Sequence, residues 1–176
     1  MQAQTRLLIL LVCAMVVTIT LPGCVTTPTS TLENASTIST TMSGSADGNS
    51  LTTTHYLVTI GGTTVYAEAA NTPAEHEMGL MNQTYLNENS GMLFVFPTEQ
   101  KQSFWMKNMH VSLDIIFITT DKHVLGVYQS VPPCTTDPCV LYTSNAPIRY
   151  VLEVNAGFSE RHGITSGDTV FITPTS

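Results

Sequence analysis

The feature that most limits how this chain can fold is the composition of residues 25–54. This segment contains 16 serines and threonines, few apolar residues and almost no charge. A segment with so little apolar surface cannot offset the conformational entropy lost on ordering, so it does not form a core of its own. Residues 55–176 have the length and the apolar content of one ordinary domain. We therefore expect a single domain at 55–176, preceded by a flexible linker.

The amino-terminal residues have the order of a secretory signal. Residues 7–21 form the uncharged apolar run LLILLVCAMVVTITL behind Arg6. This run is shorter than the roughly 20 apolar residues of a membrane-spanning helix, and its position is typical of an export signal. It ends in Leu-Pro-Gly before Cys24, which resembles the lipidation site of exported lipoproteins. The sequence predicts a signal peptide over residues 1–23 and lipidation at Cys24.

Two alternatives to lipidation are a plain secretory signal with an incidental cysteine and an uncleaved anchor. All three place the domain outside the cytoplasm. With lipid at Cys24, residues 24–54 would act as a Ser/Thr-rich linker with a mean reach of about 30 Å. We expect an extracytoplasmic domain anchored to the cell membrane, with the membrane as one partner through the lipid.

Cys134 and Cys139 are the cysteines of the expected domain, in the run PPCTTDPC. Export favours a disulfide, and the short proline-stiffened loop leaves little chain entropy to oppose its closure. The spacing is not Cys-x-x-Cys, which disfavours a redox-active pair, and two thiols alone would leave a metal ion under-coordinated. Asn34 and Asn82 begin sequons that matter only in a cell that glycosylates exported proteins.

The charge of the domain argues against nucleic acid as a partner. Residues 55–176 contain eleven Asp and Glu side chains and five Lys and Arg side chains. Binding to phosphates requires clustered cations, and the few basic residues here are scattered.

Short β-rich runs separated by turn residues predict a mainly β (α+β) domain. Residues 56–60 and 63–69 flank Gly61-Gly62, a β-hairpin pattern, and Thr72-Pro73 predicts the start of one short helix. A helical turn is expected over 157–162. Further strands are expected over 91–96, ending at Pro97, and over 113–119, 124–131, 149–154 and 169–173. We expect an antiparallel barrel-like or sandwich domain capped by one short helix.

Polar side chains are concentrated next to two of these strands. The run FWMKNMHVSLDIIFI, from Phe104 to Ile118, contains Asp114 within an apolar strand. Glu153 is a second carboxylate in an apolar strand, and the strand period places it on the opposite face from Leu152 and Val154. A carboxylate in such a position needs a partner, a ligand or a proton.

The order of the motifs resembles the family of domains of unknown function number 192. The motifs are GLM (79–81), GMLFVF (91–96), FWMKN (104–108), LDIIFI (113–118), YVLEVNAG (150–157) and GD (167–168). The resemblance implies a small exported or membrane-tethered β-rich domain over 56–173 and brings no agreed activity. Met78, Gln83 and Met109 depart from the family, which usually has arginine, arginine and threonine at these places.

Two roles remain open for the polar residues. The first is a ligand pocket for a small molecule or an envelope component, lined by Trp105, Lys107, Asn108, Asp114 and Glu153. The second is a structural network in which Lys107 pairs with Asp114 or Glu153, Asn108 caps a turn and Trp105 fills the core.

Two other functional readings are weaker. Five methionines lie within 32 residues, and Met106, Met109 and His110 could bind Cu(I) outside the cytoplasm, although methionine is commonly a core filler. Asp114 and Glu153 could act as the acid and base of a hydrolase. No nucleophile, zinc, phosphate-loop or cofactor motif is present in the sequence, so we predict no cofactor and favour binding over catalysis.

Overall fold

A computed structural model describes residues 54–175 of the chain. The predicted signal peptide, Cys24, Asn34 and the linker through residue 53 lie outside the described residues. No helix within residues 54–175 is both long and apolar enough to cross a membrane. The strands are β1 (His55–Ile60), β2 (Thr63–Ala70), β3 (Ser90–Gln100), β4 (Ser103–Phe104), β5 (Leu113–Ile118), β6 (Val124–Val131), β7 (Tyr142–Thr143), β8 (Ile148–Asn155) and β9 (Phe171–Pro174); the helices are α1 (Pro73–Met78) and α2 (Phe158–Arg161).

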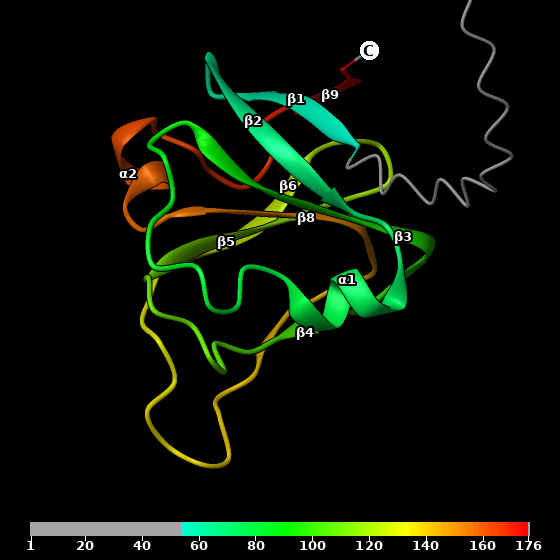
Figure 1. The fold of residues 1–176 in the computed structure, drawn as a ribbon. Coiled ribbons are helices and arrows are strands. Elements are labelled where there is room, and N and C mark those ends of the chain that lie inside the picture. The colour runs from blue at the N-terminus through cyan, green and yellow to red at the C-terminus, as the bar shows by residue number, and fades with distance from the viewer. Residues whose placement is uncertain (1–53, 176) are drawn as a thin grey trace, which may run out of the picture. The chain divides into compact units, whose positions relative to one another are not determined.

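Seven of the strands form one sheet in the order β6-β5-β8-β3-β2-β1-β9, and β4 pairs with β7 beside it (Figure 1). All neighbours are antiparallel except β2 and β3, which are parallel and joined through α1. The prediction of a mainly β, α+β domain is confirmed. The barrel alternative is wrong, because the sheet ends in two edges, β6 and β9, and does not close within the described residues.

The local sequence explains the first elements. Gly61 and Gly62 both have positive φ, 57° and 78°, as the tight turn between β1 and β2 requires. At α1 the Thr72 side chain accepts a hydrogen bond from the Glu75 N–H, and the Glu75 carboxylate accepts one from the Thr72 N–H. This capping box, with Pro73 at the first helical turn, starts the helix where the sequence predicts it.

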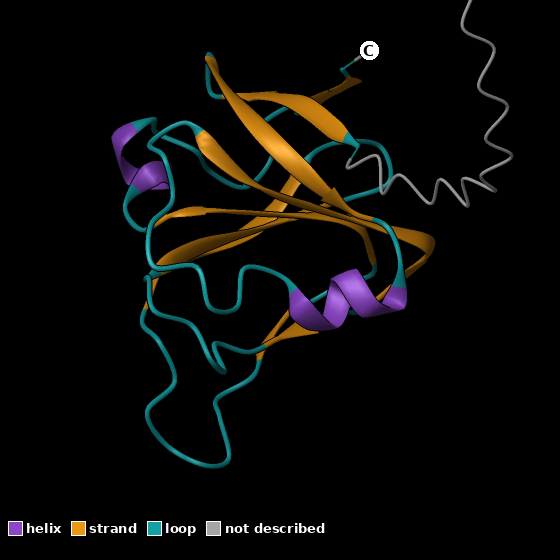
Figure 2. Ribbon diagram, viewed as in Figure 1, coloured by secondary structure: helices purple, strands orange, loops and turns teal. Residues whose placement is uncertain are grey.

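Two details of the predicted elements need correction. Pro97 does not end β3, which continues to Gln100, although its register with β8 shifts between Val95 and Gln100. Proline has no N–H for the ladder, so an irregular pairing can accommodate it. The predicted helical turn after Gly157 forms a second short helix, α2. Figure 2 shows the two helices at separate places around the sheet.

The sheet has an apolar core on each face. One, which we call the closed core, joins the β1–β2 end of the sheet to β5 and β8: Val58 and Val65 share a cluster with Ile116 and Leu152. The other, the cavity-side core, includes Leu80, Phe94, Phe96, Met106 and Val151 and lies beneath the segments that follow α1 and β4. A strand with apolar residues on both faces is fully buried, which explains why all six residues of β5 are buried.

Asp114 lies on the face of the closed core and accepts three backbone hydrogen bonds. Its Oδ1 accepts from the N–H groups of Ser130 (2.7 Å) and Gly157 (3.0 Å), and its Oδ2 accepts from that of Ser159 (2.7 Å). The register between β5 and β6 shifts by one residue beside Asp114, which leaves the Ser130 N–H outside the ladder. The other two donors belong to the start of α2, which has no side-chain cap of its own.

Replacing Asp114 should therefore destabilise the domain. Asp114→Ala leaves three donors at a buried position without an acceptor, and charge-assisted hydrogen bonds contribute about 1.5–3 kcal/mol each. We expect the free energy of unfolding, measured by urea denaturation, to fall by at least about 3 kcal/mol. Asp137→Ala, at an exposed loop residue, should change it by less than about 0.5 kcal/mol. A similar loss in both variants would contradict this role.

Candidate functional site

A cavity of about 130 Å³ lies on the cavity-side core, between α1, the turn after it, and β4. Seven of its fourteen lining residues are phenylalanine, tryptophan or methionine, and its polar groups include side chains from α1, the β3–β4 connection and β8. Figure 1 shows α1 and β4 next to each other on this side of the sheet. The lining residues are His76, Glu77, Met78, Gly79, Leu80, Met81, Phe94, Phe96, Gln102, Ser103, Phe104, Trp105, Met109 and Glu153.

Glu153 is the buried acid of this cavity. It projects from β8, next to Met92 of β3 and Ile115 of β5, and only 5% of its surface is exposed. Within residues 54–175 no hydrogen-bond donor or cation contacts its carboxyl group, and burial raises its pKa to about 8. A carboxyl group in this environment is mostly protonated at neutral pH, unless a ligand compensates its charge.

Gly79 brings the chain close to Glu153. It ends α1 with φ 49°, a conformation that side chains rarely adopt. A Cβ atom at this position would lie 3.2 Å from the Phe94 Cζ atom and 3.9 Å from Glu153 Oε2. Glycine at this position therefore leaves space next to the carboxyl group. This explains why the GLM motif begins with glycine, at the wall of the cavity.

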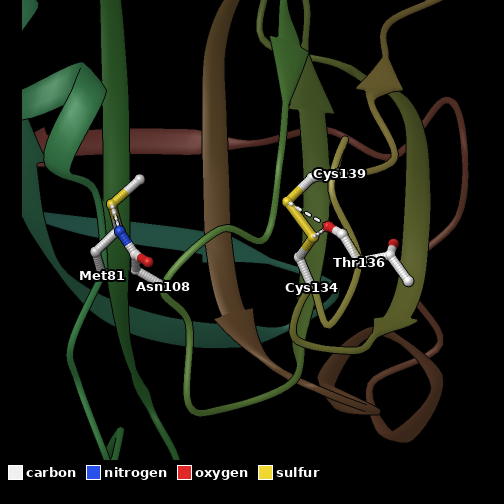
Figure 3. Close-up of a disulfide and its surroundings, with 5 residues drawn as sticks. All are labelled: Met81, Asn108, Cys134, Thr136 and Cys139. Carbon is white, nitrogen blue, oxygen red and sulfur yellow. Dashed lines mark hydrogen bonds between the residues drawn. A yellow bond between two sulfur atoms is a disulfide. The ribbon is translucent and has the colours of Figure 1, made fainter.

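The segment from Trp105 to Asn108 forms a turn that connects both sides of the site. The Asn82 N–H donates to the Asn108 carbonyl oxygen (3.0 Å), and the Cys134 N–H donates to that of Met106 (2.9 Å). Figure 3 shows the Asn108 amide directed at Met81, with Nδ2 3.9 Å from Sδ. The same view shows the predicted disulfide between Cys134 and Cys139, whose Cα atoms are 5.7 Å apart.

The five residues of the predicted pocket do not share one site. Trp105 and Glu153 line the 130 Å³ cavity, whereas Lys107 and Asn108 line a shallower groove of about 440 Å³ beside it. Trp105 belongs to both spaces, and the Lys107 ammonium lies 5.5 Å from the centre of its ring. Asp114 is on the other face of the sheet, since Asp114 pairs with Val154 while Glu153 pairs with Ile115.

This register has consequences for two of the sequence hypotheses. Two carboxylates on opposite faces of a sheet cannot act on one substrate, so Asp114 and Glu153 do not form the acid–base pair of a hydrolase. The predicted pairing of Lys107 with Asp114 or Glu153 is also not found: among the described residues no ion pair joins Lys107 to either carboxylate. Asp114 accepts hydrogen bonds from backbone N–H groups instead.

The methionines and the histidine that line the cavity differ in part from the Cu(I) ligands predicted from the sequence. Met106 is buried in the cavity-side core and His110 is exposed, and neither lines the cavity. Met109 does, together with Met78 and Met81. His76 was not identified from the sequence: its Nε2 donates to the Ala70 carbonyl oxygen (2.9 Å), and its ring lies 4.5 Å from that of Phe96. His76 lies three residues before Gly79 of the GLM motif, and this nearness was the available signal in the sequence.

Residues 56–172 match the DUF192 family, described as an uncharacterized ACR. The chain belongs to this family. A crystal structure from Sinorhizobium meliloti 1021, of a protein provisionally described as a transcription regulator, is similar to this domain, with TM-score 0.61 and 29% identity over 68% of this chain and 92% of the other. A protein of unknown function from Novosphingobium aromaticivorans matches with TM-score 0.61 and 34% identity over 65% and 83% of the two chains. No curated protein matches significantly.

The raised pKa of Glu153 predicts how stability depends on pH. The ordinary carboxyl pKa is 4.5, and burial raises that of Glu153 to about 8 in the folded protein. Between these values the unfolded chain loses the proton and the folded chain keeps it, so the free energy of unfolding decreases as pH rises, by at most about 1.4 kcal/mol per pH unit. This contribution is complete below about pH 4.5 and lost by about pH 8.

Glu153→Gln stays neutral at every pH and should remove this part of the slope. Urea denaturation at about pH 5 and about pH 8 measures it, and Glu99→Gln, at an exposed residue, is the matched control that should keep the slope of the parent protein. An unchanged slope in Glu153→Gln would show that this carboxyl group ionises normally.

Proposed function

We propose that this protein is an exported domain, tethered to the cell membrane through lipid at Cys24, that binds a small ligand in the cavity around Glu153. The ligand is a free small molecule or an exposed group of an envelope component. The observation that carries the binding proposal is Glu153, a residue only 5% exposed, whose carboxyl group has no hydrogen-bond donor or cation beside it within residues 54–175 and which lines the cavity with Phe94, Phe104 and Trp105. A buried polar group without a partner has a free-energy cost that a ligand can relieve.

The cavity sets the size of the ligand. Its volume of about 130 Å³ compares with the roughly 150 Å³ of an engineered cavity that binds benzene, so it accommodates a group of about six non-hydrogen atoms. The neighbouring groove at Trp105, Lys107 and Asn108 shares four lining residues with the cavity, namely Glu77, Met78, Met81 and Trp105. A larger ligand would place one end in the cavity and the remainder along this groove.

Cu(I) binding is the second candidate, and one observation favours it. Met78, Met81 and Met109 line the same cavity as His76, so three thioethers and an imidazole surround one space. Soft sulfur ligands select Cu(I). These donors differ from Met106 and His110, which lie outside the cavity.

The similarity to a protein described as a transcription regulator does not change this proposal. The present chain has a formal net charge of −7, with few basic residues to contact phosphates. A nucleic-acid partner is therefore not part of the proposed function.

Binding can be tested with Trp105, the only tryptophan in the sequence and part of the cavity wall. The full chain in detergent is screened against small polar organic compounds and chelator-buffered Cu(I), following Trp105 fluorescence and the melting temperature. We expect a ligand that saturates both signals and binds Gly79→Ala at least about tenfold more weakly, because the added methyl group enters the cavity.

Gly163→Ala is the control, since Gly163 also has positive φ but an added Cβ would meet nothing within 4 Å. It should keep the affinity of the parent protein. Organic ligands should bind Met81→Leu normally, whereas Cu(I) should bind it more weakly. The binding proposal fails if no compound or ion changes either signal, or if every ligand binds Gly79→Ala as well as Gly163→Ala.

The tether predicts a covalent modification. In cells the mature chain should begin at Cys24 and carry the mass of attached lipid, and the protein should fractionate with membranes. Cys24→Ala should lose the added mass and the lipid-dependent retention. Mass spectrometry of the mature amino terminus measures this; an unmodified Cys24 or an intact signal in the parent protein would contradict the anchor.

A further inference from the structure

The charges around the cavity indicate which ligands it excludes. Its lining contains two acids, Glu77 and Glu153, and no lysine or arginine. His76 is the one basic side chain in the lining, and its Nε2 is already engaged with the Ala70 carbonyl oxygen. An anion in this space would find no lysine or arginine in the lining to compensate its charge and would lie near Glu77, so the lining disfavours anionic ligands.

The walls of the cavity suit a cation with an apolar body. Phe94 and Phe96 both contact the Phe104 ring edge to face, with ring centres 5.0 and 6.5 Å apart, and Trp105 completes this side of the cavity. Aromatic faces carry partial negative charge and attract ammonium groups. The Lys107 ammonium, 5.5 Å from the centre of the Trp105 ring, is an example of that interaction at the edge of this site.

We propose that the cavity binds a small organic ammonium ion, with its nitrogen next to the Glu153 carboxylate and its alkyl part against Phe104 and Trp105. This inference rests on the proposed function, since it names the ligand class of the same cavity. An ammonium group provides the opposite charge that Glu153 lacks in the described protein, and the buried position of Glu153 strengthens the attraction between the two charges.

Binding of such a cation should release a proton. Burial raises the pKa of Glu153 to about 8, so the empty site holds a neutral carboxyl group at neutral pH. The ligand cation stabilises the carboxylate, and the proton leaves to water or buffer. The other titratable groups near the site are His76 and Glu77 in the lining and Lys107 beside Trp105. Apparent affinity should therefore rise with pH, by up to about tenfold per unit below pH 8, and level off above it.

The test compares cations with neutral compounds of the same shape. The probes are tetramethylammonium with tert-butanol, and n-butylammonium with 1-butanol; the members of each pair have equal numbers of non-hydrogen atoms. They are titrated into the full chain in detergent between about pH 6 and pH 9, following Trp105 fluorescence. We expect at least one cation to bind about tenfold or more tightly than its alcohol at pH 9, with a smaller difference at pH 6. Calorimetry in two buffers of different ionisation enthalpy should show proton release near neutral pH.

Variants assign the effect to Glu153. Glu153→Gln should lose the preference for the cation and its pH dependence while still binding the alcohols, whereas Glu99→Gln should behave as the parent protein. Met78→Arg is a second variant at an exposed lining residue, and its added cation should weaken ammonium binding more than alcohol binding.

The outcomes separate this inference from the proposed function. Equal affinity for cations and alcohols at every pH would overturn the ammonium ligand and leave a small-molecule site. Cation binding that persists in Glu153→Gln with the same pH dependence would also overturn it. Absence of binding by these probes would overturn the ammonium ligand, while the proposed function would be judged by the wider screen.

Discussion

The register between β5 and β8 is the constraint from which the organisation of this domain follows. It pairs Asp114 with Val154 and Ile115 with Glu153, so the two carboxylates of the central strands project to opposite faces. On the closed-core face, three backbone N–H groups surround Asp114 and tie the bulge of β6 to the start of α2. On the other face Glu153 has no such donors within the described residues. A shift of one residue between these two strands would place both carboxylates on the same face of the sheet.

The two buried acids have different roles: Asp114 stabilises the fold, whereas Glu153 belongs to the proposed binding site. Asp114 contributes to folding because each of its oxygens accepts hydrogen bonds from groups that the β-ladder and the helix leave unpaired. Glu153 lowers stability wherever it must ionise, and natural proteins commonly retain such a cost where a ligand or partner compensates it. Glu153 lines a cavity that Gly79 keeps open, so the space in which a ligand could compensate its charge lies next to the carboxyl group.

Membership in the DUF192 family establishes the fold, and the two similar crystal structures share it without a settled activity. The arguments about function therefore come from this chain's own side chains. Met78, Met81 and Met109 give the cavity a thioether wall, and Lys107 approaches Trp105 at its edge. If the proposed ligand binding holds, these residues set which ligands the site accepts, because a fold shared by a family does not specify the chemistry of a pocket.

The sequence alone determined the elements that depend on local chemistry: the Gly61-Gly62 hairpin, the Thr72 cap of α1, the alternating faces of β8 and the Cys134–Cys139 disulfide. Local preferences for turns, caps and strand periods act over a few residues, and sequence patterns record them. Sequence also marked Asp114 and Glu153 as unusual, but it could not separate their roles. Only the tertiary structure decided that Asp114 binds backbone donors, that Glu153 and Trp105 share a cavity with the unforeseen His76 and Gly79, and that Lys107 lies outside it. Those relations depend on strand register and on segments that meet across the sheet, and no local pattern encodes them.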